Sequence, residues 1–471
     1  MELMSNPGGL KTMPPGVMNI ADLKQQKRSG RTLSKAVSLH LEGKLEGAAR
    51  LITKAIEGGE QDPGLYSALG HIYYEMRDYE AASGAYSQLV ELDARHRTAH
   101  FNLGVCRGNV KDWQGAAECF GRALDIDGSR SGALLGLGVA LLHSGRPADA
   151  MDPLDKFLSL FPDHEQALFG KAVCLQQTGR HAEAVEFYRK VLSRNPQSEE
   201  ALSNLVSLFL ELKDRDSIRR YAEMLADLQP ESPVALEALA TMAFAEADYL
   251  TAARHCRNLA EIAPDRYENW FNLGVAYHKM GNHQKAALAY QQAIAVKPDA
   301  VQAYLNLGVS HQELSDLTAA RGCYEKAIEV DPNQPDVLWN LGLVLEQQNE
   351  RPRAEKLYAK IPEDAAEWPD ATFRLGYLQL MRADYAAAAE AFHACLSKRP
   401  DWPEAYLNAG IAHARSGVPE DARRSFQEAL TLRPDSSDAV RGLAALALEQ
   451  QEYEEAYHCL LYTSPSPRDT R

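Results

Sequence analysis

Few residues in this chain have the types and the spacing that catalysis or metal binding requires. His96 and His100 stand four residues apart, so on a helix their imidazoles would share one face and could ligate a transition metal. No carboxylate or cysteine accompanies them at ligand spacing. The sequence also lacks glycine-rich phosphate loops, the GxSxG nucleophile elbow and the HExxH zinc motif. We therefore expect no catalytic residue, no metal ligand and no cofactor.

The seven cysteines are scattered through the chain, and none belongs to a CxxC pair. Such spacing favours buried, reduced thiols over a disulfide framework or a zinc site. The chain has no apolar run of 18 residues, and its first residues, MELMSNPGGLKTMPPGVMN, lack the apolar core of a signal peptide. These features predict a cytoplasmic protein without a membrane span.

Charge is distributed unevenly along the chain. The formal net charge is −15, yet residues 1–35 contain six Lys/Arg and two Asp/Glu and so carry +4. The rest is strongly acidic, which argues against nucleic acid as a partner because phosphate binding needs a basic surface. We expect residues 1–28 to form a disordered basic leader, and contact with an acidic surface is the alternative.

A four-residue word recurs on a fixed period and sets the pattern of elements. NLGV occurs at 102–105, 272–275 and 306–309, and NLGL follows at 340–343, so all four share a 34-residue period. Thirteen positions follow this period from Ala36 to Ala444, and twelve of them hold glycine or alanine. Twelve residues after each lies a second series, Ala48 to Ala456, in which twelve of thirteen are alanine. The chain is therefore an array of 34-residue units, called here repeats one to thirteen.

Residue types within each repeat predict a pair of helices. Small side chains are needed where two helices approach closely. Four residues after the second small position a large apolar residue is frequent, and this spacing places both on one helix face. Eight residues further on, proline frequently ends the second helix, as at Pro298 and Pro332. The segment IPEDAAEW at 361–368 lacks this proline, so we expect a distorted joint there.

The pattern resembles that of the tetratricopeptide repeat (TPR) family. Repeat eight matches the family throughout, at Trp270, Leu273, Gly274, Tyr277, Ala286, Tyr290 and Pro298. The resemblance covers residues 29–461 and implies an all-α fold, a right-handed superhelical solenoid of about thirteen helix–turn–helix repeats. It also implies that first helices line a concave groove.

In six repeats an asparagine stands two residues before the first small position, which in the family faces the groove. These residues are Asn102, Asn204, Asn272, Asn306, Asn340 and Asn408. An amide both donates and accepts hydrogen bonds, so a row of amides could hold the backbone of an extended peptide whatever its side chains. This resembles the asparagine ladder in the TPR region of peptide O-GlcNAc transferases. The alternative is that the amides bond to neighbouring helices.

Aromatic residues complete the candidate peptide site. Phe271 and Trp339 directly precede Asn272 and Asn340. Apolar contacts must supply much of the affinity, because three hydrogen bonds at about 1 kcal/mol each fall short of the roughly 4 kcal/mol of a millimolar complex. Some chaperone-binding TPR domains clamp a C-terminal carboxylate, but only Asn340 and Arg374 match the five clamp positions. We therefore count Arg374 as a peptide-contact candidate without that clamp.

Acidic residues recur near the start of first helices in the last repeats. They are Glu268, Asp336, Asp370, Glu404 and Asp438. As an acidic rim they would select a basic partner, whereas the alternative is that they complement the positive end of the helix dipole.

The sequence thus predicts a non-enzymatic scaffold that binds an extended or helical protein segment in its groove. The alternative is a substrate-recruiting arm of a larger enzyme, such as a protein glycosyltransferase, whose catalytic domain is missing from this chain. Pro465 and Pro467 interrupt the last second helix, so we expect residues 462–471 to be a disordered, non-native or truncated tail.

Overall fold

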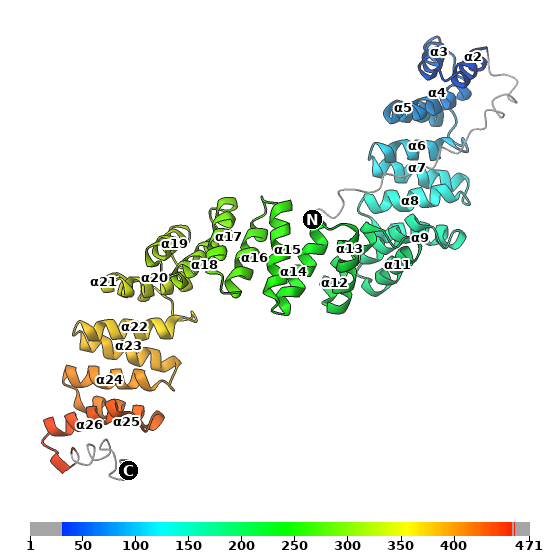
Figure 1. The fold of residues 1–471 in the computed structure, drawn as a ribbon. Helices are drawn as coiled ribbons and strands as arrows, with labels where there is room; N and C mark the ends of the chain where they lie inside the picture. Colours follow the sequence, from blue (N-terminus) through cyan, green and yellow to red (C-terminus); the bar gives the residue numbers. More distant parts are fainter. Residues whose placement is uncertain (1–30, 455, 457–471) are drawn as a thin grey trace. The chain divides into compact units, whose positions relative to one another are not determined.

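The structure is a computed structural model that describes residues 31–454 and 456 (Figure 1). The predicted leader, residues 1–28, and the predicted tail, residues 462–471, lie outside the described residues. Within the described residues the chain forms 25 α-helices and no strand, so the predicted all-α solenoid of helical repeats is confirmed. The chain divides between Ala238 and Leu239 into two compact halves, which are described separately below.

Each of repeats one to twelve supplies a first and a second helix, and repeat thirteen supplies the first helix α26. The first helices are α2 (Arg31–Leu41), α4 (Pro63–Glu75), α6 (Ala99–Asn109), α8 (Ser131–His143), α10 (Glu165–Gln177), α12 (Glu199–Leu212), α14 (Pro233–Ala245), α16 (Tyr267–Lys279), α18 (Val301–Glu313), α20 (Pro335–Gln347), α22 (Trp368–Met381), α24 (Pro403–Ser416) and α26 (Ser437–Glu449). The second helices are α3 (Leu45–Glu57), α5 (Tyr79–Leu92), α7 (Trp113–Ile126), α9 (Pro147–Leu160), α11 (His181–Arg194), α13 (Arg215–Leu228), α15 (Tyr249–Ile262), α17 (His283–Val296), α19 (Leu317–Val330), α21 (Arg351–Tyr358), α23 (Tyr385–Lys398) and α25 (Pro419–Leu432). From α2 to α13 and from α15 to α26, helices that follow one another in the chain pack side by side. None of the described helices has the length and hydropathy needed to cross a membrane.

The turn between the two helices of a repeat has one conformation throughout the array. In all thirteen repeats the residue five before the second small position has a positive φ. Glycine occupies it in five repeats, as at Gly281 (φ 72°), but Ala247 (φ 57°) and Ser315 (φ 60°) adopt it too. The next residue is the N-cap of the second helix and is often a short acid or amide. Asp78 and Asp316, for example, each accept a hydrogen bond at 3.0 Å from the backbone N–H three residues later.

The small residues allow the two helices of a repeat to touch. A Cβ added to Gly308 would lie 2.4 Å from Cε1 of Tyr324, and one added to Gly342 would lie 2.3 Å from Cε1 of Tyr358. Both tyrosine rings are buried. The first helix therefore lies directly against the large side chain of the second helix, and glycine is needed because a methyl group has no room.

Repeat ten departs from the regular pattern. Its second helix, α21, has 8 residues, whereas the other described second helices have 13 or 14. The helix ends at Tyr358, and the following segment reaches α22 without the usual proline while burying Ile361. The distortion expected from the segment 361–368 therefore takes the form of a shortened helix.

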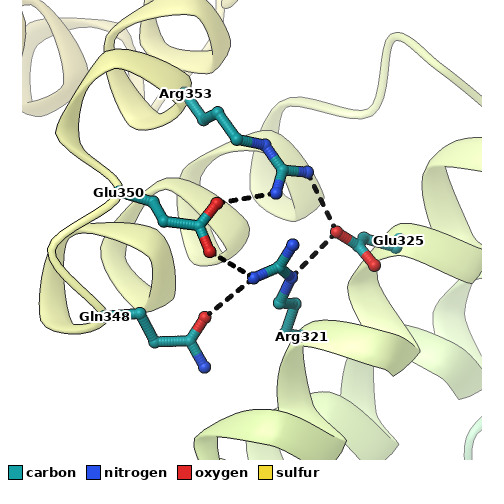
Figure 2. Close-up of polar contacts among 5 residues, drawn as sticks. All are labelled: Arg321, Glu325, Gln348, Glu350 and Arg353. Carbon is teal, nitrogen blue, oxygen red and sulfur yellow. Dashed lines mark hydrogen bonds and ion pairs between the residues drawn. The ribbon is translucent and has the colours of Figure 1, made fainter.

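An ionic network fastens repeat nine to repeat ten. Figure 2 shows Arg321 of α19 bonded to Glu350 at 2.6 Å and to Gln348 at 3.2 Å, both from the turn before α21. Arg353 closes the ring through Glu350 at 2.7 Å and Glu325 at 3.1 Å. Glu350 occupies the capping position of α21 but makes no cap hydrogen bond. Its longer side chain reaches the arginine of the preceding repeat instead.

Candidate functional site

The six predicted asparagines all lie in the middle of first helices, but their exposure differs. Asn272 in α16 is exposed, whereas Asn306 in α18 and Asn340 in α20 are half-buried, as are Asn204 and Asn408. Asn102 in α6 is buried, at 5% exposure. These differences follow from what each amide contacts.

A buried tyrosine from the preceding second helix reaches three of these amides. Burial raises the pKa of Tyr290, and a hydrogen bond with Asn306, sixteen residues later, acts in the opposite direction. Burial likewise raises the pKa of Tyr188, opposed by a hydrogen bond with Asn204. Both phenol rings are almost fully buried, at 1% exposure or less. A buried hydroxyl needs a hydrogen-bond partner, and the amide of the next repeat lies near enough to act as one.

The third pair, Tyr86 and Asn102, is the most deeply buried. Burial raises the pKa of Tyr86, and Asn102 lies near enough to oppose that shift. Even so, the Tyr86 hydroxyl and the Asn102 Oδ1 make no hydrogen bond of good geometry in the described structure. The pair is arranged as in the other two repeats, with the amide facing the phenol across the repeat boundary.

Tyrosine hydroxyls also bond back to the first helix of their own repeat. Tyr188 donates to Oε1 of Gln176 at 2.7 Å, and Tyr358 donates to Oε1 of Glu346 at 2.6 Å. Tyr324 makes the matching bond to Gln312. In each case the acceptor stands twelve residues before the tyrosine. The hydroxyl therefore emerges between two successive first helices, on the side where the asparagines lie.

This arrangement is written in the sequence as a pairing of residue types. Tyrosine occupies the large position of the second helix in five repeats, and a hydrogen-bonding residue follows each sixteen residues later. The pairs are Tyr86 with Asn102, Tyr188 with Asn204, Tyr290 with Asn306, Tyr324 with Asn340, and Tyr358 with Arg374. When the large position holds another residue, the position sixteen residues later is glycine or alanine in five cases of seven, namely Ala68, Gly136, Gly170, Ala238 and Gly442. The exceptions are Asn272 and Asn408.

The two exceptions, Asn272 and Asn408, have no buried tyrosine hydroxyl to pair with. The residue sixteen before Asn272 is Cys256, and the residue sixteen before Asn408 is Phe392, so neither amide faces a phenol hydroxyl. Neither side chain makes a hydrogen bond to the described residues. Asn306 also accepts from Gln302 at 3.3 Å, so its carbonyl is partly used. Among the adjacent repeats eight to ten, Asn272 is therefore the amide with its full hydrogen-bonding capacity available.

Asn340 uses part of its hydrogen-bonding capacity within its own helix. Its Nδ2 donates to the backbone carbonyl of Asp336 at 2.7 Å, one turn earlier in α20. This bond uses one amide hydrogen and leaves the Oδ1 atom and the second hydrogen for another group.

The aromatic residues beside the asparagines pack in one recurring way. Phe271 lies 5.7 Å from the ring of Tyr290, and Trp339 lies 5.6 Å from the ring of Tyr358. Phe373 makes the same contact with the ring of Phe392 at 5.6 Å, and in all three pairs the second ring comes nineteen residues after the first. Phe271, Trp339 and Phe373 are all half-buried. Each therefore packs on the repeat core and leaves part of its ring accessible, and two of them also stack on a further ring, Phe271 on Tyr267 at 5.4 Å and Phe373 on Trp402 at 4.4 Å.

Arg374 faces an acid rather than open solvent. Its Nη1 atom lies 3.5 Å from Oε2 of Glu346, whose other oxygen accepts from Tyr358. Burial raises the pKa of Tyr358, and the bond to Glu346 adds to the effect. The side chain of Arg374 remains 43% exposed. Its charge is thus partly balanced within the chain, while one edge of its guanidinium is open.

Several residues of the acidic series are paired within their own repeat. Glu404 lies 2.6 Å from Arg433, and Asp370 lies 3.2 Å from Arg399. Asp336 accepts the Val337 N–H at 2.8 Å at the start of α20. These contacts fit the structural alternative for the series, because they balance its charge at helix starts.

His96 and His100 bond to the backbone at the start of α6. The backbone N–H of Ala99 donates to Nδ1 of His96 at 3.2 Å, and Nε2 of His100 lies 2.9 Å from the carbonyl oxygen of Ala94. Burial lowers the pKa of His96.

Comparison with family profiles agrees with this geometry. Tetratricopeptide repeat profiles match residues 67–107, 109–165, 145–208, 267–300, 370–401 and 407–467, and a TPR repeat profile matches 313–349. This chain is a tetratricopeptide repeat protein. A comparison with curated proteins gave no match.

Three solved structures resemble the TPR protein. The crystal structure of the APC/C hetero-tetramer Cut9–Hcn1 has 17% identity and a TM-score of 0.35, covering 91% of this chain and 98% of that one. YrrB, described as a TPR protein with an unusual peptide-binding site, has 24% identity and a TM-score of 0.37, covering 40% and 98%. The pilF protein of Pseudomonas aeruginosa has 21% identity and a TM-score of 0.35, covering 41% and 89%. At these values the resemblances carry no inference about function.

Proposed function

We propose that this TPR protein is a non-catalytic scaffold that binds an extended or helical segment of another protein along α16, α18 and α20. TPR domains in general mediate protein–protein interaction. One observation supports this particular location: three first helices in adjacent repeats present matching side chains that are not fully buried. These are Asn272, Asn306 and Asn340 with Val275, Val309 and Leu343. The resulting row is called here the amide row.

The amide row combines fixed polar groups with accessible apolar surface. Phe271 and Trp339 stand at its two ends and are held on the buried rings of Tyr290 and Tyr358. Half-buried aromatics with a fixed orientation lose little side-chain entropy on binding, which is why such residues are frequent at interaction hot spots. The row can therefore offer directional contacts to a backbone and apolar contacts to its side chains.

The amides alone are too weak to hold a segment. Asn272 is uncommitted, whereas Asn306 and Asn340 have each spent part of their capacity inside the chain. At about 1 kcal/mol for each new hydrogen bond, the three supply roughly 2–3 kcal/mol. Burying the exposed parts of Phe271 and Trp339 adds about 1 kcal/mol for each ring. Affinity in the micromolar range then requires further contacts from neighbouring repeats, such as Arg374 or Asn408 in the same half.

The cysteines and the charge of the chain favour a protein partner and a reducing compartment. The described cysteines are free, and five of the six are buried, which supports the predicted cytoplasmic location. Glu268 has no ion-pair partner among the described residues, so one acid of the series remains open to a basic side chain at the start of α16. The net charge of −15 also disfavours nucleic acid as the ligand.

The test begins with a peptide ligand selected from a random peptide display library on the full chain. Its dissociation constant is then measured by fluorescence anisotropy for the wild type and for Asn272→Ala and Trp339→Ala. We expect Asn272→Ala to weaken binding about fivefold, equivalent to one hydrogen bond of ~1 kcal/mol. We expect at least about tenfold for Trp339→Ala, because it removes a fixed aromatic contact.

Leu288→Ala is the matched control, since Leu288 lies on the second helix α17 and is 63% exposed. It should leave affinity unchanged, and circular dichroism should show equal helicity for all variants. The single variant Asn272→Ala is preferable to a triple substitution, because Asn306→Ala would also deprive buried Tyr290 of its partner. If Leu288→Ala weakens binding of the peptide while Asn272→Ala and Trp339→Ala leave it unchanged, the peptide binds on the side of the second helices and the proposal is wrong.

A further inference from the structure

Three possible metal ligands meet on first helices near the start of the described chain. His40 lies in the last turn of α2, and His71 and Glu75 lie one turn apart in α4. Nε2 of His40 lies 2.8 Å from Oε2 of Glu75, and Nε2 of His71 lies 3.1 Å from Oε1 of the same carboxylate. The three ligand atoms all lie within 4.8 Å of one another. They are called here the His40 cluster.

We propose that the His40 cluster binds a divalent transition-metal ion, with Zn²⁺ the best match. Two imidazoles and one carboxylate form a known three-ligand set for zinc, which leaves the fourth position open for water or an added ligand. In a tetrahedral zinc site with bonds near 2.0–2.2 Å, ligand atoms lie roughly 3.3 Å apart. Glu75 lies between the two histidines, which face its two oxygens at 2.8 and 3.1 Å, and all three ligand atoms lie within 4.8 Å of one another, so side-chain adjustment can bring them to this spacing.

The surroundings of the cluster suit a metal site better than a surface ion pair. The side chains of His40 and His71 are 16% and 26% exposed, so both rings are held by neighbouring residues. Their ring centroids lie 5.8 Å apart. No other described residues form such a three-ligand group.

The position of the cluster gives the ion a structural consequence. His40 belongs to repeat one, whereas His71 and Glu75 belong to repeat two, so a bound ion would join α2 to α4. Because repeats in a solenoid are held by contacts with their neighbours, repeat one can open away from repeat two. A metal ion that binds only while repeat one is packed on repeat two suppresses this opening. The suppression grows in proportion to the ratio of the free metal concentration to the dissociation constant of the metal.

The experiment titrates the metal-free full chain with ZnCl₂ by isothermal calorimetry. We expect one saturable site in the wild type. Glu75→Gln keeps an oxygen that accepts from either histidine but removes the anionic ligand, and His71→Ala removes an imidazole. Each should weaken zinc binding more than about 100-fold, since loss of an outer-shell partner alone costs about 10- to 100-fold. His413→Ala is the matched control, because Nε2 of His413 lies 2.7 Å from Nε2 of His393 in a two-histidine contact without a third ligand.

Hydrogen exchange gives a second readout that does not depend on heat of binding. At a zinc concentration 100 times the dissociation constant, exchange of α2 amides that open with repeat one should slow about 100-fold in the wild type and not in Glu75→Gln. The proposal is overturned if the wild type shows no saturable site, or if zinc binding persists in both Glu75→Gln and His71→Ala. It is equally overturned if His413→Ala is the variant that loses binding.

Discussion

Replacing Gly308 by alanine tests how closely the two helices of repeat nine must approach. The added Cβ would lie 2.4 Å from Cε1 of Tyr324, whereas ordinary contact begins at 3.4 Å, so the helices must separate by about 1 Å. The ring cannot easily turn aside, because it is fully buried and its hydroxyl is bonded to Gln312. Overpacking costs about 1–3 kcal/mol, and this geometry favours the upper end. Alanine's higher helix propensity offsets about 1 kcal/mol, which leaves a net loss of about 2 kcal/mol.

Gly322→Ala supplies a control of opposite sign in the same repeat. Gly322 lies in α19 on the exposed side, and a Cβ there would meet nothing within 4 Å. Only the helix-propensity term remains, so this substitution should stabilise the repeat by about 0.5–1 kcal/mol.

Native-state hydrogen exchange of the full chain measures both effects locally, which suits a solenoid whose repeats open separately. Amides of α18 and α19 should exchange roughly 30-fold faster in Gly308→Ala and about two- to fivefold slower in Gly322→Ala. Repeat five shows how the reasoning could fail, because it places Ala172 at the position of Gly308 and still buries Tyr188. If Gly308→Ala exchanges like the wild type, repeat nine can adopt that wider spacing, and the close contact does not limit its stability.

Two further predictions concern buried side chains. Tyr358→Phe should destabilise repeat ten by about 2 kcal/mol, because it removes a hydrogen bond to the charged carboxylate of Glu346, whose side chain is 15% exposed. Hydrogen exchange of the α21 amides measures this loss. An unchanged exchange rate would contradict the prediction. Burial raises the pKa of the Cys106 thiol to about 12 from an ordinary value of 9.0, so the unfolded chain ionises first as pH rises. The stability that this thiol contributes should be intact below pH 9 and decline between pH 9 and 12, by up to about 1.4 kcal/mol per pH unit. Urea midpoints across this range should fall less steeply for Cys106→Ala, and equal slopes would refute the assignment.

The repeat pattern could predict the helices because each repeat obeys the same local rules. The period of small residues located the helix pairs of repeats one to twelve, and the missing proline near residue 361 indicated a distorted joint, next to which the second helix α21 is short. The physical reason is that neighbour contacts dominate a solenoid, so 34 residues contain nearly all the information that a repeat needs. The turn residue is less readable, since Ala247 adopts a positive φ that sequence alone assigns to glycine.

Side-chain partnerships across repeats were harder to anticipate. The pairing of a buried tyrosine with a polar residue sixteen positions later is visible in the sequence, but only once the structure shows which helix faces meet. The His40 cluster has a comparable signal: His71 and Glu75 are one turn apart, and His40 stands one repeat plus one residue before Glu75. Neither spacing matches a familiar metal motif, because the ligands come from two repeats. Such sites are set by stacking and not by any single helix.

The leading asparagine of NLGV therefore does not have one role. At Asn306 it partners the hydroxyl of Tyr290, so removing the amide would disturb the core as well as any ligand. At Asn272 no phenol stands behind it, and the amide is exposed. A uniform peptide ladder would require every member to keep its capacity for the ligand, which Asn306 does not. If the amide row binds a peptide, its hydrogen bonds to that peptide must be strongest at repeat eight and must weaken toward repeat nine. A ligand whose contacts were equal at Asn272 and Asn306 would require the Tyr290 hydroxyl to find another partner on binding.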